Sequence, residues 1–244
     1  MKDPTNESLT PLQFYSLGEH SITIVFGNEI HLEISGRIHL FNENLLSSPF
    51  PGFITTVVAY GTLTVHYNIE QVAHSTLRGL SCFDKVCGYL KSLENFSRSK
   101  ETLTKTTIRV PVCYGFEHGP DLTELAKEKE LDEQAFIDLH CSCIYTVYMI
   151  GFVPGFAYLG GMNPLLSASR KLKPRSAVPA GSVGIAGLQT GIYPLITPGG
   201  WQLIGQTPLR LFDPIRSQPS LFHAGDLIQF YPISVKEFNH LSKS

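Results

Sequence analysis

The sequence predicts an α+β protein in two parts, an α+β domain over residues 1–100 and a β-barrel domain over residues 105–244. Before residue 100, strand and helix patterns alternate, which is typical of helices laid on one face of an antiparallel sheet. After residue 105, short apolar runs lie between frequent glycines, as in a small barrel with long loops. The intervening residues 95–107 are polar and rich in Ser, Lys and Thr, which favours a linker.

The first domain has the expected order strand, strand, helix, strand, strand, helix. A strand is predicted over residues 21–26, and strands over 53–60 and 63–67 are expected to meet in a hairpin at Gly61-Thr62. Apolar residues at helical spacing predict the two helices. The first helix carries Ile30, Ile34, Ile38, Phe41 and Leu45, and the second carries Val72, Leu80, Phe83, Val86, Leu90 and Leu93.

The second domain begins with a predicted strand and two acidic helices. These elements are expected over residues 107–113, 121–129 and 132–141. Short apolar runs between glycines and prolines then predict the remaining barrel strands. Those strands are expected over residues 145–152, 182–186, 193–196, 202–204 and 227–231.

Composition excludes several functional classes. A formal net charge of -2 leaves no basic excess for nucleic acid. No apolar run approaches the ~20 residues that span a bilayer, and the polar first residues lack the apolar core of a signal peptide. Five cysteines form no CxxC pair and leave an odd count, which predicts reduced thiols in a cytoplasmic protein.

The second domain contains a long stretch without acidic residues, since no Asp or Glu lies between Asp138 and Asp213. The same stretch carries Arg170, Lys171, Lys173, Arg175 and Arg210. These cations could pair with the acidic helices just upstream. The alternative, which we favour, is an anion site made of Arg175 and of backbone N–H groups exposed by the glycine-spaced strand 182–186.

The only tryptophan, Trp201, follows Gly199-Gly200 in a stretch with a proline near each end. One interpretation is a turn whose indole folds back onto the barrel wall. The other is a loop in which the glycines let the main chain approach a ligand or partner, while Trp201 covers it as a lid or anchor. Together with the neighbouring motifs, the second interpretation is favoured, and it predicts an exposed indole in the free chain.

Motifs of self-sufficient enzymes are absent from the sequence. There is no GxxxxGK[ST] phosphate loop, no GxSxG nucleophile elbow and no HExxH or Cys/His pair at zinc spacing, so no metal site is expected. His140, at the end of a predicted helix, is interpreted as a core histidine in preference to a catalytic base. With no nucleophile–base pair legible, an enzyme active by itself is disfavoured.

Four segments of the second domain carry a family resemblance. "GFVPGFAYLGG" (151–161), "PRSAVPAGSVGIAG" (174–187), "QTGIYPLITPGGWQLIGQTP" (189–208) and "GDLIQFYP" (225–232) resemble the family of 5-oxoprolinase B subunits, also called KipI or allophanate hydrolase subunit 1. The resemblance covers about residues 10–235 and is specific only in the second domain. It implies a small α/β-sandwich-like N-terminal domain joined to a cyclophilin-like β-barrel.

The resemblance also implies a function that needs partners. Together with subunits C and A, the chain would take part in ATP-dependent opening of 5-oxoproline to L-glutamate, as a hydrolase subunit that is not active alone. ATP would be bound in the assembled complex and not by a phosphate loop of this chain. The alternatives are KipI-like inhibition of a sporulation histidine kinase and carboxyl transfer on urea-like substrates.

The sequence assigns no catalytic residue but offers candidates for binding. The candidates for binding substrate or an anion are Arg175, Gln189, Tyr158 and His140, and those for a loop or interface anchor are Gly199, Gly200 and Trp201. The chain departs from the family pattern where it has Glu19, Asn68, Gln202 and Gln206, the last two standing where arginine is frequent. These departures weaken the expectation for the substrate more than that for the family.

Overall fold

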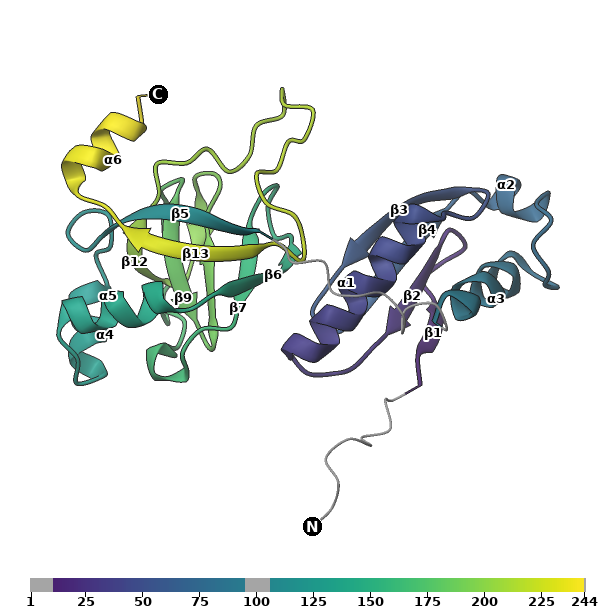
Figure 1. Ribbon diagram of the computed structural model, residues 1–244, viewed down its shortest axis with the longest axis horizontal. Coiled ribbons are helices and arrows are strands. Elements are labelled where there is room, and N and C mark those ends of the chain that lie inside the picture. The colour runs from purple at the N-terminus through teal and green to yellow at the C-terminus, as the bar shows by residue number, and fades with distance from the viewer. Residues whose placement is uncertain (1–10, 95–105, 244) are drawn as a thin grey trace, which may run out of the picture. The chain divides into compact units, whose positions relative to one another are not determined.

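The computed structural model describes residues 11–94 and 106–243. The chain forms two compact units, Met1–Leu103 and Thr104–Ser244 (Figure 1). The predicted linker lies almost entirely outside the described residues, apart from its last two positions. The α+β fold class is confirmed, because the first unit is a sheet with helices and the second contains a closed barrel.

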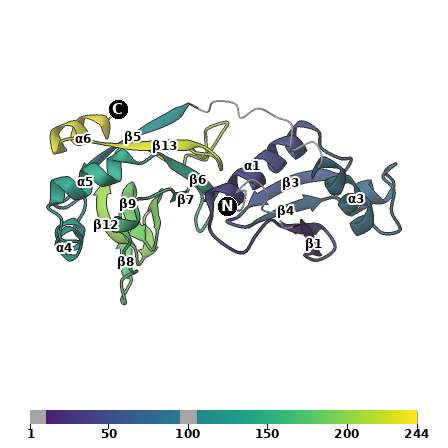
Figure 2. The ribbon, with the colours of Figure 1, turned by 60° about the horizontal axis from the view of Figure 1, so that its bottom comes forward.

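The first unit is built on a four-stranded antiparallel sheet in the order β1-β2-β4-β3. Its strands are β1 (Gln13–Ser16), β2 (Ser21–Val25), β3 (Phe53–Val58) and β4 (Thr62–Tyr67). The helices are α1 (Leu32–Ser47), α2 (Ile69–Ala73) and α3 (Cys82–Glu94). Ile22 and Leu63 of the sheet share one core with Ile38 of α1 and Leu90 of α3, so these helices pack on one face. Figure 2 shows α1 running along the sheet.

The single second helix predicted for this unit is wrong, because the segment forms two helices. Asn68 accepts a hydrogen bond from the Gln71 N–H and begins α2, and Ser81 accepts one from the Asp84 N–H just before α3. Each of these bonds satisfies a backbone donor that a helix start leaves unpaired. Leu80, which helical spacing assigned to the apolar stripe, is fully exposed between the two helices.

The second unit is a closed barrel of seven strands in the order β10-β7-β6-β13-β5-β12-β9. Its strands are β5 (Thr107–Tyr114), β6 (Tyr145–Ile150), β7 (Ala157–Gly160), β9 (Ser182–Ala186), β10 (Gln189–Ile192), β12 (Gln202–Gln206) and β13 (Leu227–Pro232). All pairings are antiparallel except that of β5 with β13. The interior is packed by apolar residues that include Val110, Val147, Leu159, Ile185 and Phe230.

Further elements surround the barrel. A two-stranded ribbon is formed by β8 (Arg175–Val178) and β11 (Thr197–Gly199). The helices are α4 (Leu122–Glu128), α5 (Glu133–Ser142), the short 3-10 helix η1 (Pro164–Leu166) and α6 (Val235–Leu241). None of the helices within residues 11–94 and 106–243 has the length and apolar character needed to cross a bilayer.

The predicted strand over residues 193–196 is wrong. These residues connect β10 to β11, and Pro194 cannot donate to a strand ladder because it has no N–H. The strands β7, β8, β10 and β11 were not predicted. Each is only three or four residues long and contains or adjoins a glycine or proline, so its pattern is too short to stand out.

Candidate functional site

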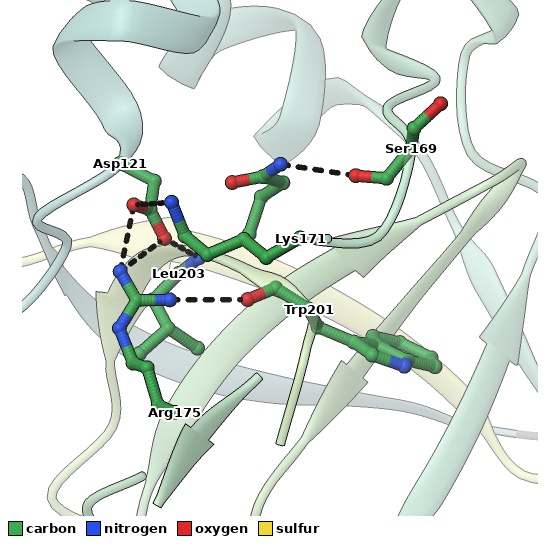
Figure 3. A network of polar contacts seen from close by, with 7 residues as sticks. Asp121, Ser169, Lys171, Arg175, Trp201 and Leu203 are labelled. Carbon is green, nitrogen blue, oxygen red and sulfur yellow. Dashed lines mark hydrogen bonds and ion pairs between the residues drawn. The ribbon is translucent and has the colours of Figure 1, made fainter. Parts of the chain in front are cut away.

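A charged network is centred on Asp121, where α4 approaches the barrel strand β12 (Figure 3). Its carboxylate is buried, with 4% of the residue exposed. Lys171 Nζ lies 2.8 Å from Oδ1, and Arg175 Nη2 donates to Oδ1 and Oδ2 at 2.7 and 2.9 Å. The backbone N–H of Leu203 also donates to Oδ2, at 2.6 Å. One carboxylate therefore joins the start of α4, the β8–β11 ribbon and β12.

Backbone hydrogen bonds position this network. The Asp121 N–H donates to the Leu203 carbonyl at 2.9 Å, which fixes the residue before α4 against β12. The Lys171 N–H donates to the Gly200 carbonyl at 2.7 Å. Arg175 pairs with Gly199 across the ribbon, and its Nη1 donates to the Trp201 carbonyl at 3.5 Å. Both cations are thus held beside the segment Gly199-Gly200-Trp201.

The network carries one more positive than negative charge. Burial alone would raise the pKa of Asp121, but hydrogen bonds from Arg175, Lys171 and the Leu203 N–H hold it below its ordinary value. The carboxylate is therefore ionised and neutralises only one of its two cations. The side chains of Lys171 and Arg175 remain 27% and 26% exposed. This exposed surplus can attract an anion.

Trp201 is buried, which corrects the expectation of an exposed indole. Only 5% of the residue is exposed. It belongs to a cluster that we call the outer aromatic cluster, which consists of Phe156, Val178, Ala186, Tyr193, Trp201 and Leu203. Its ring meets Phe156 and Tyr158 edge to face at centroid distances of 5.5 and 5.8 Å, and the Arg170 guanidinium lies 6.0 Å above it. The interpretation that the indole folds back onto the barrel wall is confirmed.

The glycines around Trp201 make room for aromatic rings. A Cβ at Gly191 would lie 2.9 Å from the indole, and one at Gly184 would lie 3.1 Å from Trp201 Cβ. A Cβ at Gly199 would lie 2.5 Å from the Tyr193 hydroxyl, closer than real Cβ atoms approach other heavy atoms. The glycine at 199 therefore makes room for a ring of the chain itself.

His140 is a core residue, and the prediction that it binds substrate or an anion is wrong. It is fully buried, with Nδ1 2.8 Å from the Tyr114 hydroxyl and Nε2 3.1 Å from Thr190 Oγ1. Its ring stacks on Phe230 at 4.7 Å. Burial lowers the pKa of His140 to about 3, so the ring is neutral at physiological pH. All polar atoms of this side chain are used inside the barrel.

The other candidate residues lie on the outside of the same wall. Because side chains alternate along a strand, Thr190 points to His140 while its neighbour Gly191 faces Trp201. Gln189 faces outward by the same rule and pairs with Ala186 of the outer aromatic cluster. Tyr158, on β7, contacts the indole directly. The structure thus brings Arg175 and Tyr158 together around Trp201, and it separates them from His140.

The strand 182–186 does not expose backbone amides, which corrects the second part of the expected anion site. Every residue of β9 is buried, and the strand pairs with β10 on one side and β12 on the other. Its amides are used in the barrel's strand pairing, so these residues do not fit a nucleoside triphosphate. Among the residues that the structure describes, no group of three or more His, Cys, Asp or Glu could hold a metal ion.

Asp121 was not predicted as the centre of the network. The one clue in the sequence was that Asp121 directly precedes a predicted helix, a position where aspartate is common. The less favoured explanation, that these cations pair with acidic residues just upstream, is confirmed for Lys171 and Arg175, which both pair with Asp121. Arg210 pairs instead with Asp213, at 3.1 Å.

Comparisons with known proteins agree with this architecture. Residues 12–222 match the family described as carboxyltransferase domain, subdomain C and D. The chain is 44% identical to the B subunit of 5-oxoprolinase from Bacillus subtilis, over 93% of this chain and 95% of that protein. It is 37% identical to the B subunit of 5-oxoprolinase from Escherichia coli, over 89% and 94%.

A solved structure shares the fold. The crystal structure of a protein named TTHA0988 superposes with a TM-score of 0.75 at 34% identity, covering 88% of this chain. This chain spans 40% of that longer one. The family match and the two relatives cover nearly all of both units. The chain therefore belongs to the family of 5-oxoprolinase B subunits, within the proteins that carry carboxyltransferase subdomains C and D.

Proposed function

We propose that this chain is the B subunit of an ATP-dependent 5-oxoprolinase, which opens 5-oxoproline to L-glutamate in complex with subunits C and A. The observation that carries the proposal is the 44% identity, over 93% of the chain, to a relative named as the B subunit of 5-oxoprolinase. That relative is matched over 95% of its own length, so the similarity extends beyond a single domain.

The chemistry of the reaction fits an anion-binding role for the network. A lactam is a resonance-stabilised amide, and opening it requires that its oxygen become a better leaving group, for instance by phosphorylation. The substrate carboxylate and a transferred phosphoryl group both favour guanidinium and ammonium donors. The surplus positive charge shared by Lys171 and Arg175 beside Asp121 supports binding of one such anion.

The partner subunits supply what this chain does not offer. Its sequence has no phosphate loop, and the glycine-spaced strand β9 is used by the barrel wall. We therefore assign ATP to a site completed by the partner subunits. The role of this chain is then to bind and orient the substrate anion through Arg175 and Lys171.

The proposal is tested by reconstitution. The chain is co-expressed with subunits C and A, and glutamate and ADP are measured after addition of 5-oxoproline and ATP. We expect turnover by the full complex, none by this chain alone, and none by subunits C and A without it. Turnover by the single chain, or undiminished turnover when it is omitted, would contradict the proposed role.

A further inference from the structure

The strand β3 is an open edge of the first unit. It ends the four-stranded sheet, next to β4, and no other strand within residues 11–94 pairs with its far side (Figure 1). Open edges present unpaired backbone groups, and monomeric proteins usually protect them with charges, prolines or bulges.

The protection of β3 is incomplete. No Asp, Glu, Lys or Arg occurs between Glu43 and Glu70, a stretch that contains the whole β3–β4 hairpin. A register shift between Phe53 and Thr55 disturbs the start of the strand, but from Thr55 to Val58 the pairing is regular. Val57 is 50% exposed on this regular part. The edge is therefore regularly paired with β4 and free of charged residues where it is most accessible.

The phase of the hydrogen bonds identifies the groups that face outward. The Ala59 N–H donates to the Thr62 carbonyl at 2.9 Å. In an antiparallel pair, hydrogen-bonded positions recur at every second residue, so Val57 and Thr55 bond to β4 as Ala59 does. The N–H and C=O groups of Thr56 and Val58 consequently point to the open edge.

We propose that β3 pairs in antiparallel fashion with β3 of a second copy of this chain, about a two-fold axis at Val57. In this register, Thr56 of each copy exchanges hydrogen bonds with Val58 of the other. The two Val57 side chains then face each other as a non-hydrogen-bonded pair, with Cα atoms about 4.5 Å apart. The two four-stranded sheets become one continuous sheet.

The sequence of the edge argues for a second copy as the occupant. Two-fold symmetry about Val57 places this residue opposite its own equivalent and keeps its neighbours within a few residues of theirs, so a charge near the axis would meet a like charge. The charge-free stretch between Glu43 and Glu70 removes that repulsion. The register also pairs residues on the same face of the sheet, because Thr56 and Val58 are half-buried toward the core while Val57 points outward.

The main test is Val57→Lys in the full chain, with mass measured by light scattering after size exclusion over a range of concentrations. We expect a wild-type dimer and an increase of at least about tenfold in the dissociation constant of the variant, because two ammonium groups would face each other. Circular dichroism checks that the variant is folded.

Tyr15→Lys is the matched control. Tyr15 lies on the opposite edge strand, β1, on the same face and in the same cross-strand row as Val57, through Thr23 and Thr64. It is 55% exposed, so the new charge has a similar environment. The control is expected to leave the dimer intact, and equal disruption by both variants would overturn the proposal.

A cross-link gives a positive test that does not depend on disrupting the dimer. Cysteines at facing positions about 4.5 Å apart between Cα atoms are within disulfide range. Under mild oxidation, Val57→Cys should give a covalent dimer on a non-reducing gel, and Tyr15→Cys should not. A wild-type chain that stays monomeric at all concentrations, or that binds only a different protein through this edge, would overturn the assignment, and so would a Val57→Cys variant that fails to cross-link.

Discussion

The barrel wall carries two polar clusters, one on each side, and they handle charge in opposite ways. Inside, His140 shares hydrogen bonds with Tyr114 and Thr190, and burial keeps the imidazole neutral. Outside, Asp121 holds two cations whose side chains remain about a quarter exposed. One residue step along β10, from Thr190 to Gly191, leads from His140 to the outer aromatic cluster, whose Trp201 carbonyl accepts a hydrogen bond from Arg175 of the Asp121 network.

The difference separates structure from recognition. A neutral, fully satisfied cluster specifies how the interior packs but offers nothing to a ligand. A network with surplus charge and partial exposure can still bind an anion. The inner cluster is therefore expected to affect stability, and the outer network to affect both stability and activity.

The largest effect is expected at the outer aromatic cluster, beside the network. Trp201→Ala should lower the free energy of unfolding by about 3–5 kcal/mol, because it leaves a cavity against Gly184 and Gly191. Urea unfolding of the isolated chain measures this. The buried indole should also give blue-shifted fluorescence without any partner. A small stability loss with red-shifted emission would return Trp201 to the role of an exposed anchor.

Asp121→Asn should have the next largest effect on stability. Breaking a buried ion pair costs up to about 3–5 kcal/mol, and the partial exposure of both cations reduces this to about 2 kcal/mol. Asp213→Asn is the matched control, since Asp213 also faces two arginines, Arg210 and Arg216, which are far more exposed. Urea unfolding measures both variants. Equal decreases in the free energy of unfolding would mean that burial of Asp121 does not strengthen its ion pairs.

Arg175→Ala tests recognition in the assembled complex. Loss of a charged hydrogen bond to the substrate should cost about 1.5–3 kcal/mol, a ten- to hundredfold fall in kcat/KM. Arg175→Lys should restore little, because one ammonium cannot reproduce the contacts of the planar guanidinium with Asp121 and the Trp201 carbonyl. Arg210→Ala serves as the control. Unchanged kinetics together with a lower melting temperature would restrict Arg175 to a structural role.

The inner cluster should appear in the pH dependence of stability. The pKa of His140 falls from the ordinary 6.5 to about 3 on folding, so below pH 6.5 the unfolded chain binds a proton that the folded chain does not. Stability should fall as pH decreases from 6.5 towards 3, by at most about 1.4 kcal/mol per pH unit from this residue. His140→Gln should reduce that slope relative to the wild-type chain. Identical slopes would contradict the assignment.

Sequence patterns predicted the elements whose periodicity is long. The helix α1 and the strands β5, β9 and β13 lie within two residues of their expected bounds, because each has a sustained apolar pattern. The shortest strands were not predicted, because residues distant in sequence pair with them and determine where they begin and end. The split of the second helix depended on two side-chain caps, which helical spacing does not reveal.

The candidate site was only partly predictable. The cations were visible as a stretch without acids, but their partner Asp121 lies 54 positions before Arg175, and only the folded barrel brings the two together. The glycines near Trp201 had two physical meanings, close approach of a ligand or of a ring, and sequence alone does not distinguish them. Which strands face each other decides this, through contacts such as Gly199 with Tyr193.

The parallel pairing of β13 with β5 also governs how the protein is made. β13 lies between β5 and β6, so the barrel closes only through residues 227–232, although β5 begins at Thr107. During synthesis on the ribosome, β5 and β6 each keep one edge unpaired until β13 has been made. The four strands described for the first unit are complete by Tyr67, so this unit can form earlier. A nascent chain halted before residue 227 would therefore present a finished sheet followed by an open barrel prone to aggregate.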